Sequence, residues 1–461
     1  MVLSLAAAAL AVSLQSDLQQ VAALAGEPSV VSAAGMTKDD QPVLTLENRS
    51  AFDLTDKKYR VVLMGAGAVD GVRWFKTSAP RAVREMCAVS ALPSADGLDE
   101  ASKQRWLTFQ AADAVIELAA GQSPAATFNA FRPARSKEHD TLIARIGRDP
   151  LAIARQLAAK YPGEPIISYI PSIAWSNALK VADLTKDASL RERVMQQTQP
   201  WRSGEKELFG NRIQLTSVAG TFVFAEVGAP ELTKKGVDAA SRVKDGDVYE
   251  YGQGWTDDMF MATVVLARNG QIDLASRMLI AYASRLQRPD GIFIHATNGP
   301  HAWGRGNGFA AFGLMEALTA MPANHPSRAP LLDIYRKQMR AIRDQQAPDG
   351  MWREVIDEPG AYREETATAM LLTAMARGIR RGWLDASFRP VVDRAWNALA
   401  AHVADDGTVI DVCTGTGAGP TKRYYLDRAA ITGADDRGGA MALQAAMEIY
   451  ELRHSPTVAA Q

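Results

Sequence analysis

The sequence has little of what marks several large classes of protein. Its 461 residues include only two cysteines, Cys87 and Cys413, which lie too far apart in the chain to suggest a disulfide framework or a metal cluster. The formal net charge is −1, which gives no electrostatic reason to expect nucleic acid or a membrane as a partner. No stretch reaches the roughly 18 to 20 apolar residues that span a bilayer. We therefore expect recognition in a local pocket, without a metal or other cofactor.

The first residues, MVLSLAAAALAVSLQS, contain an apolar run as long as the core of a signal peptide. No Lys or Arg precedes this run, and Leu3, Ala7, Leu10 and Leu14 would equally form the buried stripe of a short helix. Both interpretations stay open at this point. A periplasmic or secreted location is favoured over a cytoplasmic one.

The chain changes character along its length. Residues 1–128 are of mixed α/β type, with the clearest strand at Tyr59–Met64, and are predicted to form a small accessory domain of unclear role. Residues 129–148 are rich in Arg and short polar side chains and are predicted to be a linker. Residues 149–461 carry helical patterns only, and we expect the catalytic domain there.

An internal repeat organises the helical part. Asp-Gly turns end at Gly291, Gly350 and Gly407, about 58 residues apart, and each follows an amphipathic helix. A second helix follows each turn and begins with small residues, as in GRGNGFAAFGLMEAL from Gly304. Small residues allow close packing, which an inner ring of helices requires. About six such hairpins fit after residue 149, so we predict a closed (α/α)6 barrel rather than an open solenoid.

Unusual side chains gather where loops lead into these second helices. The stretch YEYGQGWTDDMFMA brings Asp257 and Asp258 to the start of a helix, where either residue could instead be an N-cap. In the stretch GPHAWGRGNGF, Trp303 offers a face for stacking on a sugar, and Arg305 offers a fixed fork for a carboxylate. A structural salt bridge is the alternative role of Arg305. Trp352, after another Asp-Gly turn, is predicted to line the pocket rim.

These motifs occur in an order that resembles a known family. The segments GWTDDMFMA, DGIFIHATNGPHAWGRGNGFAAFGLMEAL, DGMWREV, EETATAM and GADDRGGAMALQAAMEI are similar to those of the unsaturated rhamnogalacturonyl and glucuronyl hydrolases, glycoside hydrolase families 105 and 88. The resemblance covers about residues 149–455. It implies an all-α (α/α)6 barrel, an oligosaccharide as the partner and Asp257 as the catalytic acid. The expected substrate-binding set is Trp255, Asp258, His295, Trp303, Arg305, Asn307 and Trp352.

The chemistry that the resemblance implies needs only one acid. Polysaccharide lyases leave a terminal uronic acid with a C4=C5 double bond conjugated to the ring oxygen, and a carboxylic acid can protonate C4 of this vinyl ether. Water then adds at C5, and the product opens and expels the next sugar. No carboxylate nucleophile is required, unlike the paired carboxylates of ordinary glycosidases.

One departure from the family separates the competing hypotheses. Family members commonly carry a second aspartate on the preceding hairpin, but the corresponding stretch here, residues 212–220, has no carboxylate. A second hypothesis is therefore an ordinary glycosidase or a lyase on the same barrel, in which Tyr251 or His295 assists Asp257. A third is a helical-repeat binding protein without activity. The oligomeric state cannot be predicted.

Overall fold

The computed structural model describes the chain mainly from residue 144 to residue 455. Residues 348, 349, 359, 360, 410, 427, 429, 432 and 433 are excepted. Before residue 144 it describes four strands, paired antiparallel as β1 (Val30–Met36) with β2 (Pro42–Asn48) and β3 (Tyr59–Leu63) with β4 (Ala114–Leu118). The strand predicted from Tyr59 is thus present. The apolar segment 1–16 and most of the predicted linker lie outside the described residues, so the accessory domain stays a prediction.

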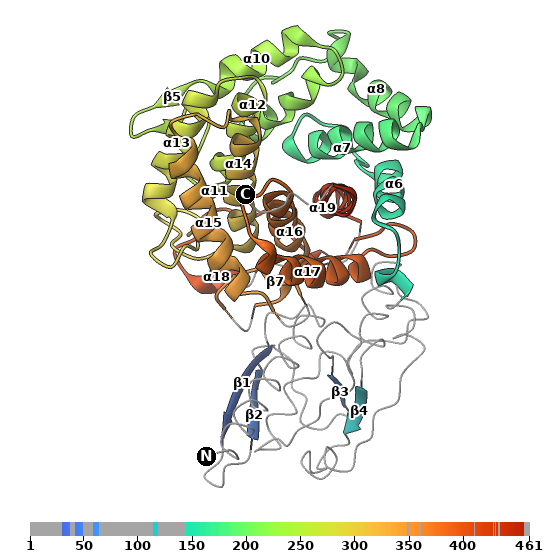
Figure 1. Cartoon of the computed structure of the whole chain (residues 1–461), viewed down its shortest axis with the longest axis vertical. Helices are drawn as coiled ribbons and strands as arrows, with labels where there is room; N and C mark the ends of the chain where they lie inside the picture. The colour runs from blue at the N-terminus through green and yellow to red at the C-terminus, as the bar shows by residue number, and fades with distance from the viewer. Residues whose placement is uncertain are drawn as a thin grey trace.

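The described residues after 144 form a helical domain in which outer and inner helices alternate along the chain (Figure 1). The outer helices are α6 (Pro150–Lys160), α8 (Ala188–Arg202), α10 (Pro230–Ala240), α13 (Ile272–Leu286), α15 (Arg328–Asp344) and α17 (Arg389–His402). The inner elements are α7 (Tyr169–Thr185), α9 (Leu215–Ala219) with η1 (Gly220–Ala225), α11 (Thr256–Met261) with α12 (Thr263–Arg268), α14 (Gly304–Ala320), α16 (Glu365–Arg380) and α19 (Asp436–His454).

Short elements complete the helical domain. Three two-stranded ladders lie in the connections, namely β5 (Val243–Lys244) with β6 (Val248–Tyr249), β7 (Trp352–Arg353) with β8 (Arg363–Glu364), and β9 (Val412–Cys413) with β10 (Ala430–Ile431). The remaining elements are η2 (Ala386–Phe388) and α18 (Lys422–Leu426). None of the helices in the described part of the chain is long and apolar enough to cross a membrane.

Burial distinguishes the two sets of helices. In the outer helix α15 the buried side chains form a single stripe, which includes Leu331, Tyr335 and Met339. In the inner helix α14 every residue from Gly304 to Leu318 is buried. An amphipathic helix faces water on one side, whereas a helix that is buried all round must be surrounded by others. The domain therefore has two concentric layers.

The inner layer closes on itself. Contacts run from α7 to η1, from η1 to α12, from α12 and α11 to α14, and onward through α16 and α19 back to α7. The Asp-Gly turns support the same closure, because each turn glycine contacts the next outer helix. A Cβ at Gly291 would lie 2.5 Å from Lys337 O of α15, and one at Gly350 would lie 2.3 Å from Arg394 O of α17. Gly407 contacts Gln156 of α6, the first outer helix. This contact closes the ring of six hairpins in the described residues.

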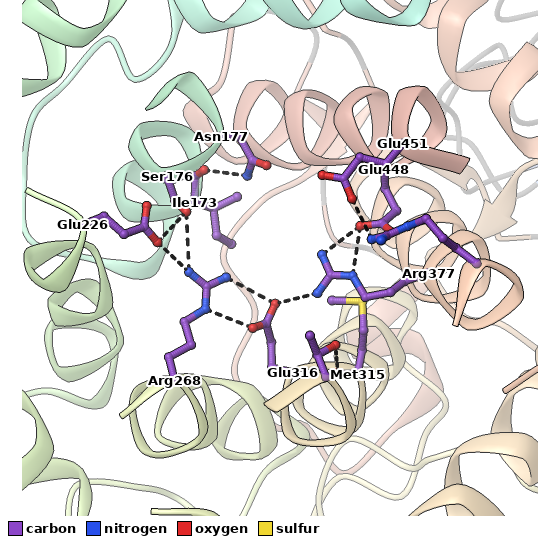
Figure 2. A network of polar contacts seen from close by, with 12 residues as sticks. Ile173, Ser176, Asn177, Glu226, Arg268, Met315, Glu316, Arg377, Glu448 and Glu451 are labelled. Atoms are coloured by element: carbon purple, nitrogen blue, oxygen red, sulfur yellow. Dashed lines mark hydrogen bonds and ion pairs between the residues drawn. The ribbon is translucent and has the colours of Figure 1, made fainter. Parts of the chain in front are cut away.

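A network of charged side chains joins the inner helices inside the ring (Figure 2). Arg268 of α12 donates from Nε to Glu316 of α14 at 2.9 Å, and Arg377 of α16 donates to the same carboxylate at 3.1 Å. Arg377 also donates to Glu448 of α19 at 2.8 Å. Burial alone would raise the pKa of Glu316, but Arg268 and Arg377 outweigh burial and lower this pKa to about 2. The network is therefore charged at neutral pH and links α12, α14, α16 and α19.

We predict that replacing Arg377 by Met destabilises the helical domain by about 3 kcal/mol, because the substitution leaves buried carboxylates without their shared cation. Urea denaturation at pH 7 measures this change. Arg340 of α15 is exposed and forms no hydrogen bond or ion pair with the described residues, so Arg340→Met is the matched control and should leave the midpoint unchanged. Equal midpoints for both variants would contradict a structural role of the network.

Candidate active site

A cavity of about 690 Å³ lies where α9 and α11 begin. This volume is within the range of about 300 to 1,000 Å³ that is common for small-molecule sites. The wall residues are Arg212, Ile213, Gln214, Leu215, Thr216, Lys244, Glu250, Tyr251, Gly252, Gln253, Trp255, Asp257, Asp258 and Met261. Three of the residues predicted for the site, Trp255, Asp257 and Asp258, are thus brought together on one wall.

Asp257 occupies the first turn of α11, and its side chain is 17% exposed. Its Oδ2 lies 3.2 Å from Nε2 of His295, whereas its Oδ1 has no hydrogen-bond partner among the described residues. One oxygen of the carboxyl group is therefore held by the protein, and the other is free to meet a ligand.

His295 links Asp257 to a buried aromatic cluster. The imidazole is fully buried, and its Nδ1 lies 3.0 Å from the hydroxyl of Tyr425. The rings of Trp255 and Trp303 pack on the imidazole at centroid distances of 5.1 and 4.5 Å. The Tyr425 hydroxyl also accepts a hydrogen bond from the backbone of Gly419 at 3.1 Å. Burial raises the pKa of Tyr425 to about 12, so this hydroxyl stays neutral and fixes the imidazole in place.

Sequence reasoning missed Tyr425. The residue belongs to the short helix α18, and 130 positions separate it from His295. The local pattern that precedes it, TGTGAGPTKRYY, is rich in glycine and ends in two tyrosines, which is a weak indication of a loop that places an aromatic side chain.

Asp258 supports the loop that leads into α11. Its carboxylate accepts hydrogen bonds from the backbone of Gly254 at 2.7 Å and Gln253 at 3.3 Å, and from the Tyr282 hydroxyl at 2.7 Å. Burial raises the pKa of Asp258 from its ordinary value of 3.8 to about 6, although Tyr282 acts in the opposite direction. Asp258 is not the N-cap of α11, because Trp255 occupies that position. The carboxylate instead fixes the turn that places Trp255 and Asp257.

Three of the residues predicted to bind substrate have partners within the protein, and their role toward a substrate stays a prediction. Arg305 donates from its two terminal nitrogens to the backbone oxygens of Cys413 at 2.7 Å and Thr414 at 2.8 Å, whereas its Nε has no hydrogen-bond partner among the described residues. Asn307 binds only backbone atoms, at Phe293 and Trp303. Trp352 is fully buried and donates from its indole to Ile342 O at 2.7 Å. The cavity wall includes none of the three.

Trp303 is also buried, with 1% of its surface exposed. The Trp303 ring packs against the imidazole of His295, and the Arg305 guanidinium lies 5.0 Å from the centroid of the Trp303 ring. The ring of Trp303 thus presents no exposed face, whereas Trp255 is partly exposed on the cavity wall.

A second group of acids lies buried beside Arg305. Glu364, at the start of α16, caps this helix by accepting hydrogen bonds from the backbone of Thr366 and Ala367. The next residue, Glu365, is fully buried, and neither oxygen of its carboxyl has a hydrogen-bond partner among the described residues. Burial and then the charge of Glu364 raise the pKa of Glu365 well above its ordinary range. Burial therefore favours the protonated form of Glu365, and the N-cap of α16 is Glu364 rather than Glu365.

The stretch that lacks the second aspartate does lie at the cavity. Residues 212–216 form part of its wall, as an alignment with the preceding hairpin predicts, and they contribute Gln214 and Thr216 in place of a carboxylate. The acids on the wall are Glu250, Asp257 and Asp258. Within the described residues no group of three or more His, Cys, Asp or Glu side chains is arranged to hold a metal ion.

Comparisons with known proteins agree with this geometry. Residues 293–453 match the model of Glycosyl Hydrolase Family 88. An unsaturated 3S-rhamnoglycuronyl hydrolase of Alteromonas sp. (strain LOR) is 28% identical over 175 residues, which are 34% of this chain and 42% of that protein. The unsaturated rhamnogalacturonyl hydrolase YesR of Bacillus subtilis (strain 168) is 27% identical over 226 residues, 44% of this chain and 64% of that protein. The chain thus spans about half the length of these curated relatives.

A solved structure shares the fold. A family 105 glycoside hydrolase of C. acetobutylicum ATCC 824 superimposes with a TM-score of 0.59 and 19% identity, over 66% of this chain and 99% of that chain. The helical domain is therefore an (α/α)6 barrel like this neighbour. The resemblance predicted from the sequence motifs is confirmed.

We predict that the stability difference between the wild type and Asp258→Asn depends on pH. The pKa of Asp258 is about 6 in the folded protein and about 3.8 when unfolded, so folding retains a proton between these values. The contribution of Asp258 to stability is therefore largest below about pH 4 and is lost as the pH rises through 6. Relative to Asp258→Asn, the wild type should lose about 2.4 kcal/mol between pH 4 and pH 7.

Denaturation curves of both proteins at several pH values measure this difference in unfolding free energy. The contributions of the other ionisable groups are the same in both proteins and cancel in the difference. A constant difference across the range, or a wild type that gains stability toward pH 7, would contradict a raised pKa of Asp258.

Proposed function

We propose that this protein is a glycoside hydrolase that removes a terminal 4,5-unsaturated uronic acid from lyase-generated oligosaccharides. The observation that carries the proposal is the carboxyl of Asp257, which lies on the cavity wall with Oδ2 held by His295 and Oδ1 free. The matches to unsaturated uronyl hydrolases support it. Both curated relatives are named for rhamnose-containing substrates, so fragments that contain rhamnose are included among the substrates to test.

The reaction begins with transfer of a proton from Asp257 to C4 of the unsaturated ring. The electron pair of the double bond forms the new C4–H bond, and the positive charge is shared by C5 and the ring oxygen. Water adds at C5 and returns a proton to the Asp257 carboxylate. The resulting hemiketal opens at the bond between C5 and the ring oxygen, and the hemiacetal at C1 then releases the next sugar with its own oxygen.

His295 and Tyr425 position the acid for this step. If Nδ1 of His295 donates its hydrogen to the Tyr425 hydroxyl, Nε2 is left as an acceptor at the contact with Asp257. The packing of Trp255 on His295 restricts both rings. The contacts of His295 therefore hold the Asp257 carboxyl in a fixed orientation.

A second candidate function has its own support. Glu250 and Tyr251 lie on the same cavity wall as Asp257, so a second carboxylate or a tyrosine base is present for an ordinary glycosidase or a lyase. Glu250 is exposed, however, and its nearest cation is Arg242 at 3.8 Å. An ordinary glycosidase would release the terminal uronate with its double bond intact, and this outcome distinguishes it from the hydration reaction.

We predict that Asp257→Asn lowers kcat/KM by at least about 100-fold, because the amide cannot donate a proton to carbon. The assay follows the ultraviolet absorbance of the double bond in lyase fragments from pectin, glycosaminoglycan and ulvan. Asp273→Asn is the matched control, since Asp273 is an exposed aspartate on the outer helix α13 whose partner, at 3.1 Å, is also a histidine, His325. Activity of Asp257→Asn within tenfold of the wild type would refute the assignment of the acid.

A further inference from the structure

The residues that line the cavity range from buried to exposed. The floor is formed by buried residues, among them Leu215, Asp258 and Met261, with Asp257 slightly exposed beside them. Arg212 at the mouth is exposed. A ligand whose terminal sugar reaches Asp257 must therefore place its following sugar near the mouth.

Two cationic side chains lie on the cavity wall, and they differ in their partners. The Lys244 ammonium donates to the backbone oxygens of Gly252 at 2.8 Å and Glu250 at 3.5 Å. Arg212 forms no hydrogen bond or ion pair with any residue that the structure describes. The guanidinium of Arg305, which the sequence offered as an anion-binding fork, is already occupied by backbone oxygens. Arg212 is thus the cation on this wall that is free to bind a ligand.

The surroundings of Arg212 favour an anion. The segment on which it lies, residues 212–216, contributes Ile213, Gln214, Leu215 and Thr216 to the wall and contains no acid. The exposed acid on the wall, Glu250, lies next to the cation Arg242 at 3.8 Å. Asp257 and Asp258 belong to the less exposed part of the wall. An anionic group at the Arg212 side of the mouth therefore meets a cation and amide or hydroxyl groups.

We infer that Arg212 binds an anionic substituent, a sulfate ester or a carboxylate, on the sugar that follows the terminal unsaturated uronate. The inference rests on the proposed function, because the cleavage reaction determines which sugar lies at Asp257 and which lies at the mouth. A planar guanidinium matches both kinds of oxyanion with two parallel hydrogen bonds. Arg212 thus selects among leaving sugars and takes no part in the proton transfer.

The test compares three unsaturated disaccharides. The first carries a sulfate ester on its second sugar, the second is the same compound after desulfation, and the third has a uronic acid as its second sugar. For Arg212→Gln we expect KM to rise about five- to tenfold on the sulfated or the uronic acid substrate, which distinguishes the two sources of the anion. KM on the desulfated compound and kcat on all three should stay within about twofold of the wild type. Arg212→Lys should show a smaller rise in KM on the anionic substrate than Arg212→Gln, because lysine keeps the positive charge.

Arg340→Gln is the matched control, because Arg340 is likewise exposed and without a partner among the described residues but lies on the outer helix α15. Added salt should raise the wild-type KM for the anionic substrate more steeply than that of Arg212→Gln. Equal effects of Arg212→Gln on the sulfated and desulfated substrates, or no effect on either anionic substrate, would overturn the inference while the proposed function stands. A wild type that acts on none of the three would remove the proposed function, and this inference with it.

Discussion

Close approach between the backbones of neighbouring inner helices is the constraint on which the rest of the structure depends. A Cβ at Gly313 of α14 would lie 1.9 Å from Met259 O of α11, and one at Gly304 would lie 2.4 Å from Arg353 O. Side chains cannot fit at such separations, so these positions require glycine. Because α11 and α14 pack this closely, the loops that precede them meet at one end of the ring. Asp257, from the start of α11, and His295, from the loop before α14, are within hydrogen-bonding distance for this reason.

The carboxyl groups of the barrel differ in whether all of their oxygens have hydrogen-bond or ion-pair partners. In the network of Arg268, Glu316, Arg377 and Glu448, each carboxylate binds two arginines, and burial does not prevent ionisation. At the cavity, by contrast, an oxygen of Asp257 has no partner among the described residues. Paired charges hold the inner helices together, whereas a carboxyl with a free oxygen is available for chemistry. A stable network therefore lets the barrel carry an incompletely satisfied site.

The sequence predicted the barrel well because its main determinants are local. The Asp-Gly turns and the small residues that begin α14 and α19 are visible as patterns, and their close contacts have the predicted structural effect. The individual side chains were harder to assign. Arg305, Asn307 and Trp352 have side chains of the kind that binds sugars, yet their partners are backbone oxygens that only the folded chain brings near. Tyr425 was missed for the same reason, since its partner His295 is distant in sequence.

We propose that the reaction begins at the double bond of the terminal uronate. The most direct test offers the enzyme two disaccharides that differ only in whether the terminal uronate is unsaturated or saturated, and measures the release of the second sugar from each. We expect release from the unsaturated compound and none from the saturated one, because Asp257 has no carbon to protonate without the double bond. Release of the second sugar from both compounds at similar rates would contradict it.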